Sequence, residues 1–392
     1  MNNFIYNTPT KVVFGNGTHT QVGKLVQEQG CRKVLLHYGS NSAKKSGLLG
    51  QIEDSLREHH IEYVTLGGVV PNPRLSLVYE GISLARQEQV DFILAVGGGS
   101  VIDSAKAIGY GVANEGDVWE FYDRKRHATA CLPIGVVLTI AAAGSEMSDS
   151  SVITKEEGGI KRGYSNDICR PKFAIMNPEL TLTLPDYQTA CGCTDILMHT
   201  LERYFPAGDH LTITDALAEG LMRTVIENAK ILKNDPQNLK ARHEIMWAGS
   251  LSHNGLTGCG IIGNDFATHG LEHELSGMFD VAHGAGLAAV WGSWARYVYK
   301  DVLPRFVRFA REVMRISIDG TDEEIALKGI EALEDFFHQI GMPTSIHELG
   351  YNLTPDQVEE LAEKFHIAAG GKKGTAKVLQ KPDMLAIYKM AL

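Results

Sequence analysis

An aspartate and several histidines recur at spacings that would bring their side chains to one metal ion. Asp195 and His199 are four residues apart, and His269 and His273 repeat this spacing, with His283 following. Residues four apart on an α-helix lie on the same face, about one turn away. One carboxylate with several imidazoles suits a borderline divalent cation such as Fe²⁺ or Zn²⁺. A single anionic ligand leaves that cation acidic enough to polarise a bound oxygen.

Each aspartate or histidine pair also has an ordinary explanation, because residues at helical spacing arise by chance on exposed helices. Two pairs followed by His283-Gly284, in a stretch rich in small and apolar residues, favour a metal site instead. Spacing alone does not choose between His273 and His283 as the last ligand. A thiolate ligand is also left open, because Cys191 and Cys193 stand close before Asp195 and both zinc and iron accept sulfur.

A glycine-rich segment upstream has the features of an anion-binding loop. Residues 90–96 are a short apolar run typical of a buried parallel strand, and residues 101–108 have the pattern of a helix. Gly97-Gly98-Gly99-Ser100 lie between them. Glycines let a diphosphate approach the backbone, and a helix N-terminus favours negative charge. The segment matches neither G-x-G-x-x-G nor the P-loop, so a tight turn with a serine N-cap is the alternative.

The chain divides into two parts with different patterns. Up to about Pro185, apolar runs alternate with helical stretches, which predicts an α/β fold with a parallel sheet. The runs expected to form strands are Lys33–Tyr38, Tyr63–Leu66, Phe92–Val96, Leu132–Leu138 and Phe173–Met176. Beyond Pro185 helical periodicity dominates. We therefore expect an α/β dinucleotide-binding domain over residues 1–185 and an all-helical metal-binding and substrate domain over residues 186–392.

Composition excludes several classes of protein. A chain of 392 residues is too long for one compact core and fits two domains. No apolar run approaches the roughly 20 residues of a membrane span, and a net charge of −10 argues against nucleic acid or an anionic membrane as a partner. The first ten residues lack the pattern of a secretory signal, and six cysteines show no disulfide framework. We expect a cytoplasmic protein with reduced thiols.

These motifs resemble the iron-containing, group III alcohol dehydrogenases, and most closely their butanol dehydrogenase and broad aldehyde reductase branch. The resemblance covers essentially the whole chain, from residues 4–15 to residues 384–392. Between these ends the matching motifs are Gly97–Lys106, Gly144–Met147, Asn177–Thr181 and the Asp/His constellation. The resemblance implies an α/β domain followed by an all-helical domain, the architecture of dehydroquinate synthase. It also implies a metal- and NAD(P)-dependent enzyme that forms a homodimer.

The resemblance implies a role for each residue of the metal constellation. The four implied ligands are Asp195, His199, His269 and His283. His273 is left unligated beside the nicotinamide and the substrate, as a catalytic residue. A neutral histidine there would relay a proton to solvent, although it could instead only orient a ligand by hydrogen bonding.

The resemblance also implies a nucleotide site. Gly98, Gly99 and Ser100 would cradle the diphosphate, and Asp103 would contact the nicotinamide end as a second catalytic residue. An acid near the start of a helix also complements the helix dipole, which is the simpler explanation for Asp103. Further residues that match positions near the nucleotide are Thr139, Lys161 and Leu180. Relatives usually carry a second threonine where this chain has Ala143, so one hydroxyl donor is missing here.

The turn after the first sheet strand bears on the choice between NADP and NAD. An acidic side chain there holds the adenosine ribose and repels a 2′-phosphate, and NAD-preferring relatives carry such an aspartate. Residues 37–45 contain no carboxylate. The residues expected to bind the nucleotide in this turn are Gly39, Ser40 and Asn41. Ser42, Lys44 and Lys45 add donors and charge, so we expect NADP(H) to be preferred over NAD(H). A polar turn with two solvated lysines would explain the same residues.

The substrate is indicated only as a class. Mostly small or apolar residues are expected around the metal, namely His253, Leu256, Cys259 and Phe266. They suit a short-chain aliphatic aldehyde or a primary alcohol such as butanol, although such sites discriminate poorly between chain lengths. Two other classes share the architecture or the ligands: a metal- and NAD-dependent lyase of the dehydroquinate synthase type, and a non-catalytic binder. The lyase would need many lysines and arginines for an anionic substrate, and the region around residues 195–283 is poor in them.

Overall fold

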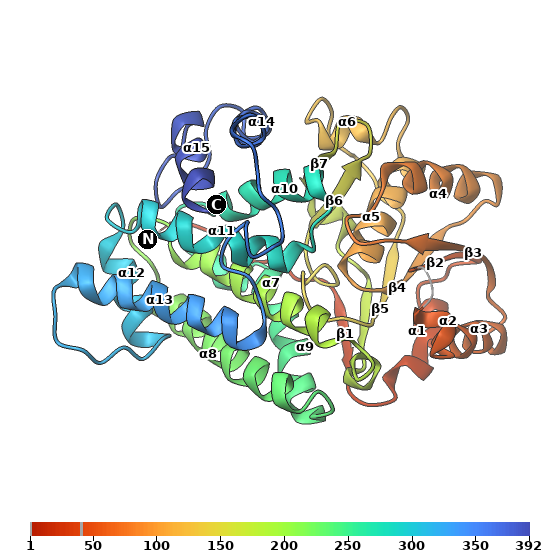
Figure 1. Cartoon of the computed structure of the whole chain (residues 1–392). Coiled ribbons are helices and arrows are strands. Elements are labelled where there is room, and N and C mark those ends of the chain that lie inside the picture. The colour runs from red at the N-terminus through yellow and green to blue at the C-terminus, as the bar shows by residue number, and fades with distance from the viewer. Residues whose placement is uncertain (1, 40–41) are drawn as a thin grey trace. The chain divides into compact units, whose positions relative to one another are not determined.

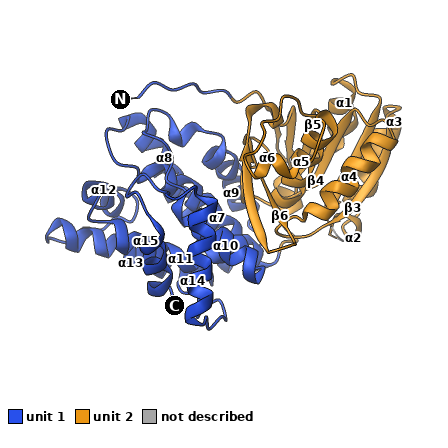
Figure 2. Cartoon of the chain, turned by 90° about the horizontal axis from the view of Figure 1, so that it is seen from above, with its two compact units in different colours: residues 1–7, 185–392 blue, residues 8–184 orange. Residues whose placement is uncertain are grey.

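The computed structural model describes residues 2–39 and 42–392 (Figure 1). The chain forms two compact units (Figure 2). One unit is Thr8–Leu184, and the other is Pro185–Leu392 together with the segment up to Asn7. The expected domain boundary at residue 185 stays a prediction; in this division the first residues group with the helices rather than with the α/β unit. Within this unit the backbone N–H and the side-chain amide of Asn2 both donate to Gly260 O, each at 3.4 Å.

Within the residues described, the α/β unit is built on a six-stranded parallel sheet, in the order β1-β8-β5-β4-β2-β3. Its strands are β1 (Lys11–Phe14), β2 (Lys33–Gly39), β3 (Glu62–Val69), β4 (Phe92–Gly97), β5 (Ile134–Leu138) and β8 (Phe173–Met176). Every apolar run expected to be a strand lies in this sheet, so the predicted parallel sheet is confirmed. The prediction missed β1, a short edge strand with no fully buried residue.

Helices cover both faces of the sheet, as expected for a parallel arrangement. They are α1 (Val22–Gln27), α2 (Ser42–Lys45), α3 (Leu48–Glu58), α4 (Leu75–Gln87), α5 (Gly99–Ala113) and α6 (Trp119–Tyr122). Side chains alternate across a strand. Leu36 of β2 therefore packs in a core with Val22 of α1 and Ile52 of α3. His37 points to the other face, where it hydrogen-bonds Ser104 of α5 at 2.9 Å.

Shorter elements complete the α/β unit. An antiparallel hairpin outside the main sheet pairs β6 (Ser150–Lys155) with β7 (Ile160–Ser165), and its turn is made by two glycines with positive φ, Gly158 and Gly159. The sequence analysis did not anticipate this hairpin. Three short 3₁₀ helices are η1 (Thr18–Gln21), η2 (Asp167–Cys169) and η3 (Pro178–Thr181).

The strand order creates a topological switch point between β2 and β4. From β2 the chain continues to β3 on one side, whereas from β4 it continues to β5 on the other. Tyr38 pairs with Val96, so Gly39 and Gly97 end these two strands as neighbours. Open parallel sheets bind ligands outside the carboxyl ends of their strands at such a point. The glycine-rich loop therefore starts where a nucleotide is expected.

Among its described residues, the regular secondary structure of the second unit is helical, apart from one isolated bridge between Lys373 and Leu379. This confirms the expected all-helical second part. Its helices are α7 (Asp186–Tyr204), α8 (Thr212–Asn234), α9 (Leu239–His253), η4 (Leu256–Gly258), α10 (Ala267–Phe279), α11 (His283–Val298), α12 (Leu303–Glu312), α13 (Asp322–Ile340), α14 (Pro355–Ala368) and α15 (Lys381–Met390). The helices α7 and α11 are buried along most of their length. In the described part of the chain, no helix has the length and apolar character needed to cross a membrane.

Candidate metal centre and nucleotide site

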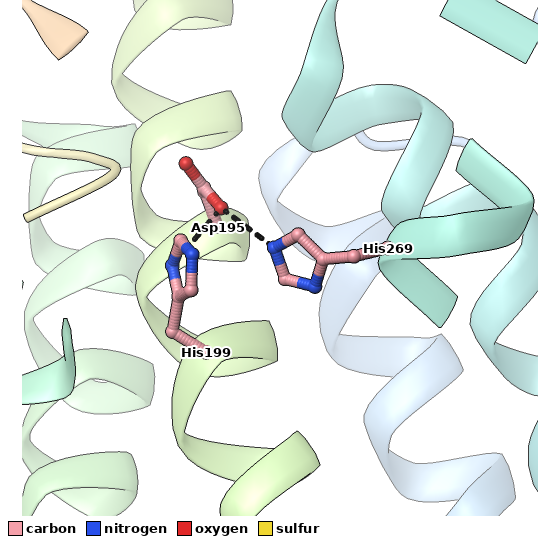
Figure 3. Close-up of side chains that lie close together, drawn as sticks. All are labelled: Asp195, His199 and His269. Carbon is pink, nitrogen blue, oxygen red and sulfur yellow. Dashed lines mark ion pairs between the residues drawn. The ribbon is translucent and has the colours of Figure 1, made fainter. Parts of the chain in front are cut away.

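Three helices of the second unit bring the predicted metal ligands together. Asp195 and His199 lie one turn apart on α7, His269 lies on α10, and His283 is the first residue of α11. Asp195, His199 and His269 are buried. Figure 3 shows these three side chains converging on one point, with the carboxylate of Asp195 between the two imidazole rings.

The distances within this cluster match those between ligands of one ion. Asp195 Oδ1 lies 3.2 Å from His199 Nδ1, 3.6 Å from His269 Nε2 and 3.6 Å from His283 Nε2. Two ligands bound tetrahedrally at ordinary zinc distances are roughly 3.3–3.6 Å apart. The two 3.6 Å separations are longer than hydrogen bonds. The arrangement is therefore better suited to sharing a cation than to direct hydrogen bonding.

Three atoms of the cluster are buried without a hydrogen-bond partner among the described residues: Asp195 Oδ1, His199 Nδ1 and His269 Nε2. A buried polar atom left unsatisfied costs about 1–3 kcal/mol. Asp195, His199 and His269 also form a group whose potential ligand atoms lie within 4.8 Å of one another. One divalent cation would satisfy all three atoms, so the residues present fit such an ion.

The electrostatics of the cluster favour ligand forms for two of these residues. Burial raises the pKa of Asp195, but the surrounding imidazoles, first His199 and then His283, more than offset it and hold the pKa well below its ordinary value. Burial lowers the pKa of His199 well below its ordinary value. Burial also disfavours the charged form of His269, yet the carboxylates of Glu202 and Asp195 together outweigh it and raise the pKa to about 9. Metal binding must therefore displace a proton from His269 at neutral pH.

Two fully buried glutamates contact the other side of the histidine rings. Glu202 of α7 contacts His269 Nδ1 and accepts the His269 backbone N–H at 3.1 Å. Glu272 of α10 contacts His283 Nδ1. The sequence analysis missed both. A signal was present, because Glu202 follows His199 by three residues and Glu272 follows His269 by three, which places each near the same helix face.

Gly284 explains how α11 reaches α7. A Cβ at Gly284 would lie 2.1 Å from the carbonyl oxygen of Cys191, so only glycine allows this backbone contact. Cys191 lies one helical turn before Asp195. The close approach therefore brings His283, the neighbour of Gly284, beside the carboxylate of Asp195.

The histidine that spacing could not assign lies nearby. The His273 ring centroid is 5.7 Å from that of His283 and 6.3 Å from that of His269. Glu272, His273 and His283 form a second group of potential ligand atoms within 4.8 Å of one another. His283 belongs to this second group, and its Nε2 is the atom that approaches Asp195 of the first group, at 3.6 Å from Oδ1.

Two of the residues expected around the metal are confirmed as neighbours of the histidines by ring contacts. The His253 ring lies 4.0 Å from that of His199, and the Phe266 ring lies 5.1 Å from that of His269. Phe266 has a left-handed backbone with φ of 50°, which is uncommon outside glycine and occurs at functional sites. Leu256 begins η4, and Cys259 directly follows this helix.

The structure does not support a thiolate ligand. In the described part of the chain, the groups able to hold a metal contain no cysteine. Burial raises the pKa of Cys191 and of Cys193 to about 12, so both thiols stay protonated at neutral pH. Cys191 Sγ instead lies 3.8 Å from the sulfur of Met342.

In the α/β unit, the glycine loop packs closely against the segment that follows β5. A Cβ at Gly98 would lie 2.0 Å from Ile140 Cγ2, and a Cβ at Gly99 would lie 3.0 Å from that of Ala143. Thr139 donates its backbone N–H to Gly97 O at 3.1 Å. Gly98 is therefore required for this packing, whether or not a diphosphate is bound, and a Cβ at Gly99 would be tightly placed. Ser100 follows them in the first turn of α5.

Asp103 is held by protein contacts. Its carboxylate accepts the Ser145 hydroxyl at 2.5 Å and the Val152 backbone N–H at 2.9 Å. One turn farther on α5, the buried ammonium of Lys106 donates to the backbone oxygens of Ser145 and Ser150 at 2.7 and 2.8 Å. Asp103 and Lys106 thus tie α5 to the segment leading into β6. The expected contact of Asp103 with the nicotinamide stays a prediction.

The other residues predicted to bind the nucleotide are distributed over the same unit. Leu180 lies in η3 and packs against the sheet core, and Lys161 is buried on β7. Gly39 ends β2 at the switch point. The Lys44 ammonium lies 5.2 Å from the ring centroid of Tyr38. Ser40 and Asn41 lie outside the described residues.

Comparison with known proteins supplies the family. Residues 9–178 match the family model described as iron-containing alcohol dehydrogenase, and residues 189–392 match the C-terminal model of the Fe-containing alcohol dehydrogenase family. The chain belongs to the iron-containing alcohol dehydrogenases. This confirms the resemblance drawn from the motifs.

Individual relatives of this iron-containing alcohol dehydrogenase align with it over most or all of its length. It is 40% identical to the probable NADH-dependent butanol dehydrogenase 2 of Bacillus subtilis, over 100% of both chains. It is 34% identical to the NADPH-dependent aldehyde reductase YqhD of Escherichia coli, over 93% of each. The crystal structure of NADH-dependent butanol dehydrogenase A from Thermotoga maritima superposes with a TM-score of 0.96 at 39% identity, covering 100% of this chain and 99% of that one. The expected NAD(P)-dependent alcohol dehydrogenase or aldehyde reductase is confirmed, and these comparisons favour it over the lyase alternative.

Proposed function

We propose that Asp195, His199, His269 and His283 bind one divalent cation, Fe²⁺ or Zn²⁺, and that the enzyme interconverts short-chain aliphatic aldehydes and primary alcohols with a nicotinamide nucleotide. The observation that carries this proposal is a set of three buried potential ligand atoms, one each on Asp195, His199 and His269. None of them has a hydrogen-bond partner among the described residues. Their separations from one another, and that of His283 from Asp195, suit a shared ion.

When bound, a divalent cation supplies Lewis acidity, which lowers the pKa of an alcohol hydroxyl and polarises an aldehyde carbonyl. The side chains determine how much of that acidity is available. Asp195 contributes a single negative charge, and the histidines are neutral as ligands, so the centre keeps a net positive charge. Burial of Asp195, His199 and His269 also excludes water, which strengthens each electrostatic interaction there.

His273 is our proposed proton-transfer residue. It stands four residues after His269 on α10, near the ring of His283, and is only partly buried. A neutral imidazole in this position can accept the hydroxyl proton during alcohol oxidation and pass it to solvent. Its alternative role, orienting a metal ligand, would leave the reaction with a different proton path.

We propose that the nucleotide diphosphate binds at the start of α5, to Gly98, Gly99 and Ser100. The helix N-terminus favours negative charge, and the loop lies at the carboxyl end of β4 beside the switch point. The other residues proposed to contact the nucleotide are Gly39, Ser40, Asn41, Asp103, Thr139, Lys161 and Leu180. Asp103 would act toward the nicotinamide end while it also holds Ser145.

We propose a preference for NADP(H) over NAD(H). The stretch from residue 37 to residue 45, which includes the end of β2 and α2, contains no carboxylate, so nothing in it repels a 2′-phosphate. Lys44 and Lys45 are exposed at the end of α2 and add positive charge. Relatives with either nucleotide in their names match this chain, so family membership alone does not choose between them.

Short aliphatic substrates fit the apolar ring of Phe266 beside the histidines. Relatives named for butanol and for aldehyde reduction are consistent with this class. We further propose a homodimer located in the cytoplasm; light scattering of the purified enzyme tests the dimer.

Variants of the four ligands test the metal centre. Asp195→Ala and His269→Ala should lose the metal and nearly all turnover together, because each removes one bond to the same ion. His273→Ala should keep the metal and only slow the reaction. Elemental analysis measures metal content for each variant. A His273→Ala protein without metal, alongside a His283→Ala protein that retains it, would contradict the ligand assignment.

An activity panel tests the reaction. The metal-free enzyme is reconstituted with Fe²⁺ or Zn²⁺ and assayed on aldehydes of increasing chain length with NADPH and with NADH. We expect one nucleotide oxidised for each aldehyde reduced. Turnover without a net change in nucleotide absorbance would favour a lyase, and metal binding without turnover of any aldehyde or alcohol would favour a non-catalytic binder.

A further inference from the structure

His269 of α10 and His283 of α11 each lie between Asp195 and a second carboxylate. In His269, Nε2 approaches Asp195 Oδ1 while Nδ1 contacts Glu202. In His283, Nε2 approaches the same oxygen while Nδ1 contacts Glu272. Glu202 and Glu272 are both fully buried. Each ring therefore has a carboxylate on either edge.

The two glutamates link the three helices in sequence. Glu202 lies on α7, the helix that carries Asp195 and His199, and it contacts His269 on α10. Glu272 lies on α10 and contacts His283 at the start of α11. His269 of α10 is thus held by a glutamate of α7, and His283 of α11 is held by a glutamate of α10. His199 shares α7 with Asp195, so the helix itself sets their spacing.

Both glutamates are themselves anchored. Glu202 Oε1 accepts the backbone N–H of His269 at 3.1 Å, so this side chain fixes both the backbone and the ring of one residue. Glu272 Oε1 contacts the hydroxyl of Ser276, one turn farther on α10. Anchoring on both carboxylate oxygens leaves each glutamate little freedom to turn away from its histidine.

A carboxylate that accepts the Nδ1 proton decides which ring nitrogen is left for a metal. It fixes the tautomer in which Nε2 carries the lone pair, orients the ring and raises its basicity. Building on the metal centre proposed above, we propose that Glu202 and Glu272 are positioning residues that aim His269 and His283 at the cation and set its affinity. Neither glutamate touches the substrate or the metal in this scheme.

Glutamine substitutions test this proposal with little change in side-chain volume. Glu202→Gln and Glu272→Gln remove the charge, and each should weaken binding of Zn²⁺ or Co²⁺ alone about 10–100-fold, measured by competition with a metal-sensitive chelator. Glu219→Gln is the matched control. Glu219 is a buried glutamate of the same unit, but it binds the Tyr204 hydroxyl at 2.8 Å and Arg308 at 2.6 Å. The control should keep wild-type metal affinity.

Two further readouts separate positioning from a general structural role. The visible absorption of the Co²⁺-loaded protein should change in the Glu202 and Glu272 variants and not in the control, because it reports ligand geometry. At saturating metal, kcat should fall while KM for the nucleotide is unchanged. Circular dichroism of the metal-free proteins checks folding. Where a glutamine variant does not fold, Glu202→Asp or Glu272→Asp keeps the charge but shortens its reach, and should weaken the metal in the same direction.

The outcomes distinguish this proposal from the one on which it rests. A wild-type protein that binds neither Zn²⁺ nor Co²⁺ would overturn the metal centre itself. A wild-type protein that binds the metal, with glutamine variants of equal affinity and unchanged Co²⁺ spectra, would overturn only the positioning role. Weakened binding in Glu219→Gln to the same degree would also overturn it, because the effect would then belong to any buried glutamate.

Discussion

The candidate nucleotide site is formed mainly by backbone, whereas the candidate metal centre is formed by side chains. The candidate nucleotide site uses consecutive glycines, Gly97–Gly99, from the last residue of β4 to the first residue of α5. The metal centre uses side chains from three helices, α7, α10 and α11, held at their far edges by two buried glutamates. The proposed nucleotide site requires the backbone to come close to the diphosphate, whereas the proposed metal centre requires the imidazoles to be oriented toward the cation.

This difference predicts how each region fails. An added methyl group is enough to obstruct a site made of backbone, whereas a site made of side chains tolerates nearby changes until a helix moves or a ligand turns. Both regions nonetheless depend on glycine at one contact: Gly98 against Ile140 in the first, and Gly284 against Cys191 in the second. Substitutions there are the sharpest tests of the comparison.

The largest effect is expected at Gly284. In Gly284→Val the new side chain would meet the Cys191 carbonyl, with Cβ at 2.1 Å, so α11 must move away from α7. Overpacking typically costs about 1–3 kcal/mol, and a backbone contact places this case at the upper end. We expect metal affinity to fall by tenfold or more although no ligand changes, measured by chelator competition alongside urea unfolding of the metal-free protein.

Gly220→Ala is the control for that variant. Gly220 also lies in a helix, but a Cβ there would meet no atom within 4 Å. Replacing it should stabilise the protein by about 0.4–1 kcal/mol and leave the metal in place. Equal metal affinity in Gly284→Val and the wild type would show that the α7–α11 contact does not position His283.

A change at Gly98 should affect the other region selectively. In Gly98→Ala the Cβ would meet Ile140 Cγ2 at 2.0 Å, which displaces the loop at the start of α5. If an overpacking cost of about 1–3 kcal/mol falls on nucleotide binding, KM for the nucleotide should rise roughly 5- to 150-fold. Metal content should stay at the wild-type level. Gly50→Ala, at an α3 position with open space, is the control; loss of metal in Gly98→Ala would contradict the separation of the two regions.

Two buried histidines should respond to pH in opposite directions in the metal-free protein. Burial lowers the pKa of His37 to about 4, so its stabilising contribution is present above the unfolded pKa near 6.5 and is lost as pH falls toward 4. For His269 the pKa is raised to about 9 despite its burial, chiefly by Glu202. Its contribution is present below 6.5 and lost as pH rises through about 9.

The measurement is urea unfolding of the metal-free protein at pH 7 and pH 5. Because the pKa of His37 is lowered in the folded protein, the free energy of unfolding should fall by about 2 kcal/mol from pH 7 to pH 5. His37→Asn should remove this pH dependence, although it also loses the contact with Ser104 and lowers stability at both pH values. An unchanged slope between pH 7 and pH 5 in the variant would show that His37 is not the titrating group.

The smallest effect is expected at Gly39. A Cβ there meets only Val69 O at 3.7 Å and Val101 Cγ2 at 4.0 Å, so a side chain is sterically allowed. Gly39→Asp should shift the ratio of kcat/KM for NADPH over NADH toward NADH, by about 1 kcal/mol or roughly fivefold, through repulsion of the 2′-phosphate. Gly39→Asn has the same shape without the charge and should not shift it. A clear NADH preference in the unmodified enzyme would refute the proposed cofactor preference.

The sequence alone predicted most of what local spacing determines. Helical spacing placed Asp195 beside His199, and apolar runs located the main parallel strands. It could not choose between His273 and His283, because His283 reaches Asp195 only through the contact of Gly284 with Cys191, a tertiary feature. The edge strand β1 and the hairpin of β6 and β7 were missed since neither has a long apolar run.

The first residues of the chain belong to the same compact unit as the helices after residue 185, and this has a consequence for the order in which the units form during synthesis. Thr8–Leu184 is one continuous stretch that is complete when Leu184 has been made, whereas Asn2 bonds Gly260, which is made 76 residues later. At about 5–20 residues per second, this delay lasts roughly 4–15 s. During this delay the α/β unit can form before Gly260, the hydrogen-bond partner of Asn2, has been made. A fragment that starts at Pro185 would therefore lack a piece of its own fold, although the stretch that precedes it would be whole.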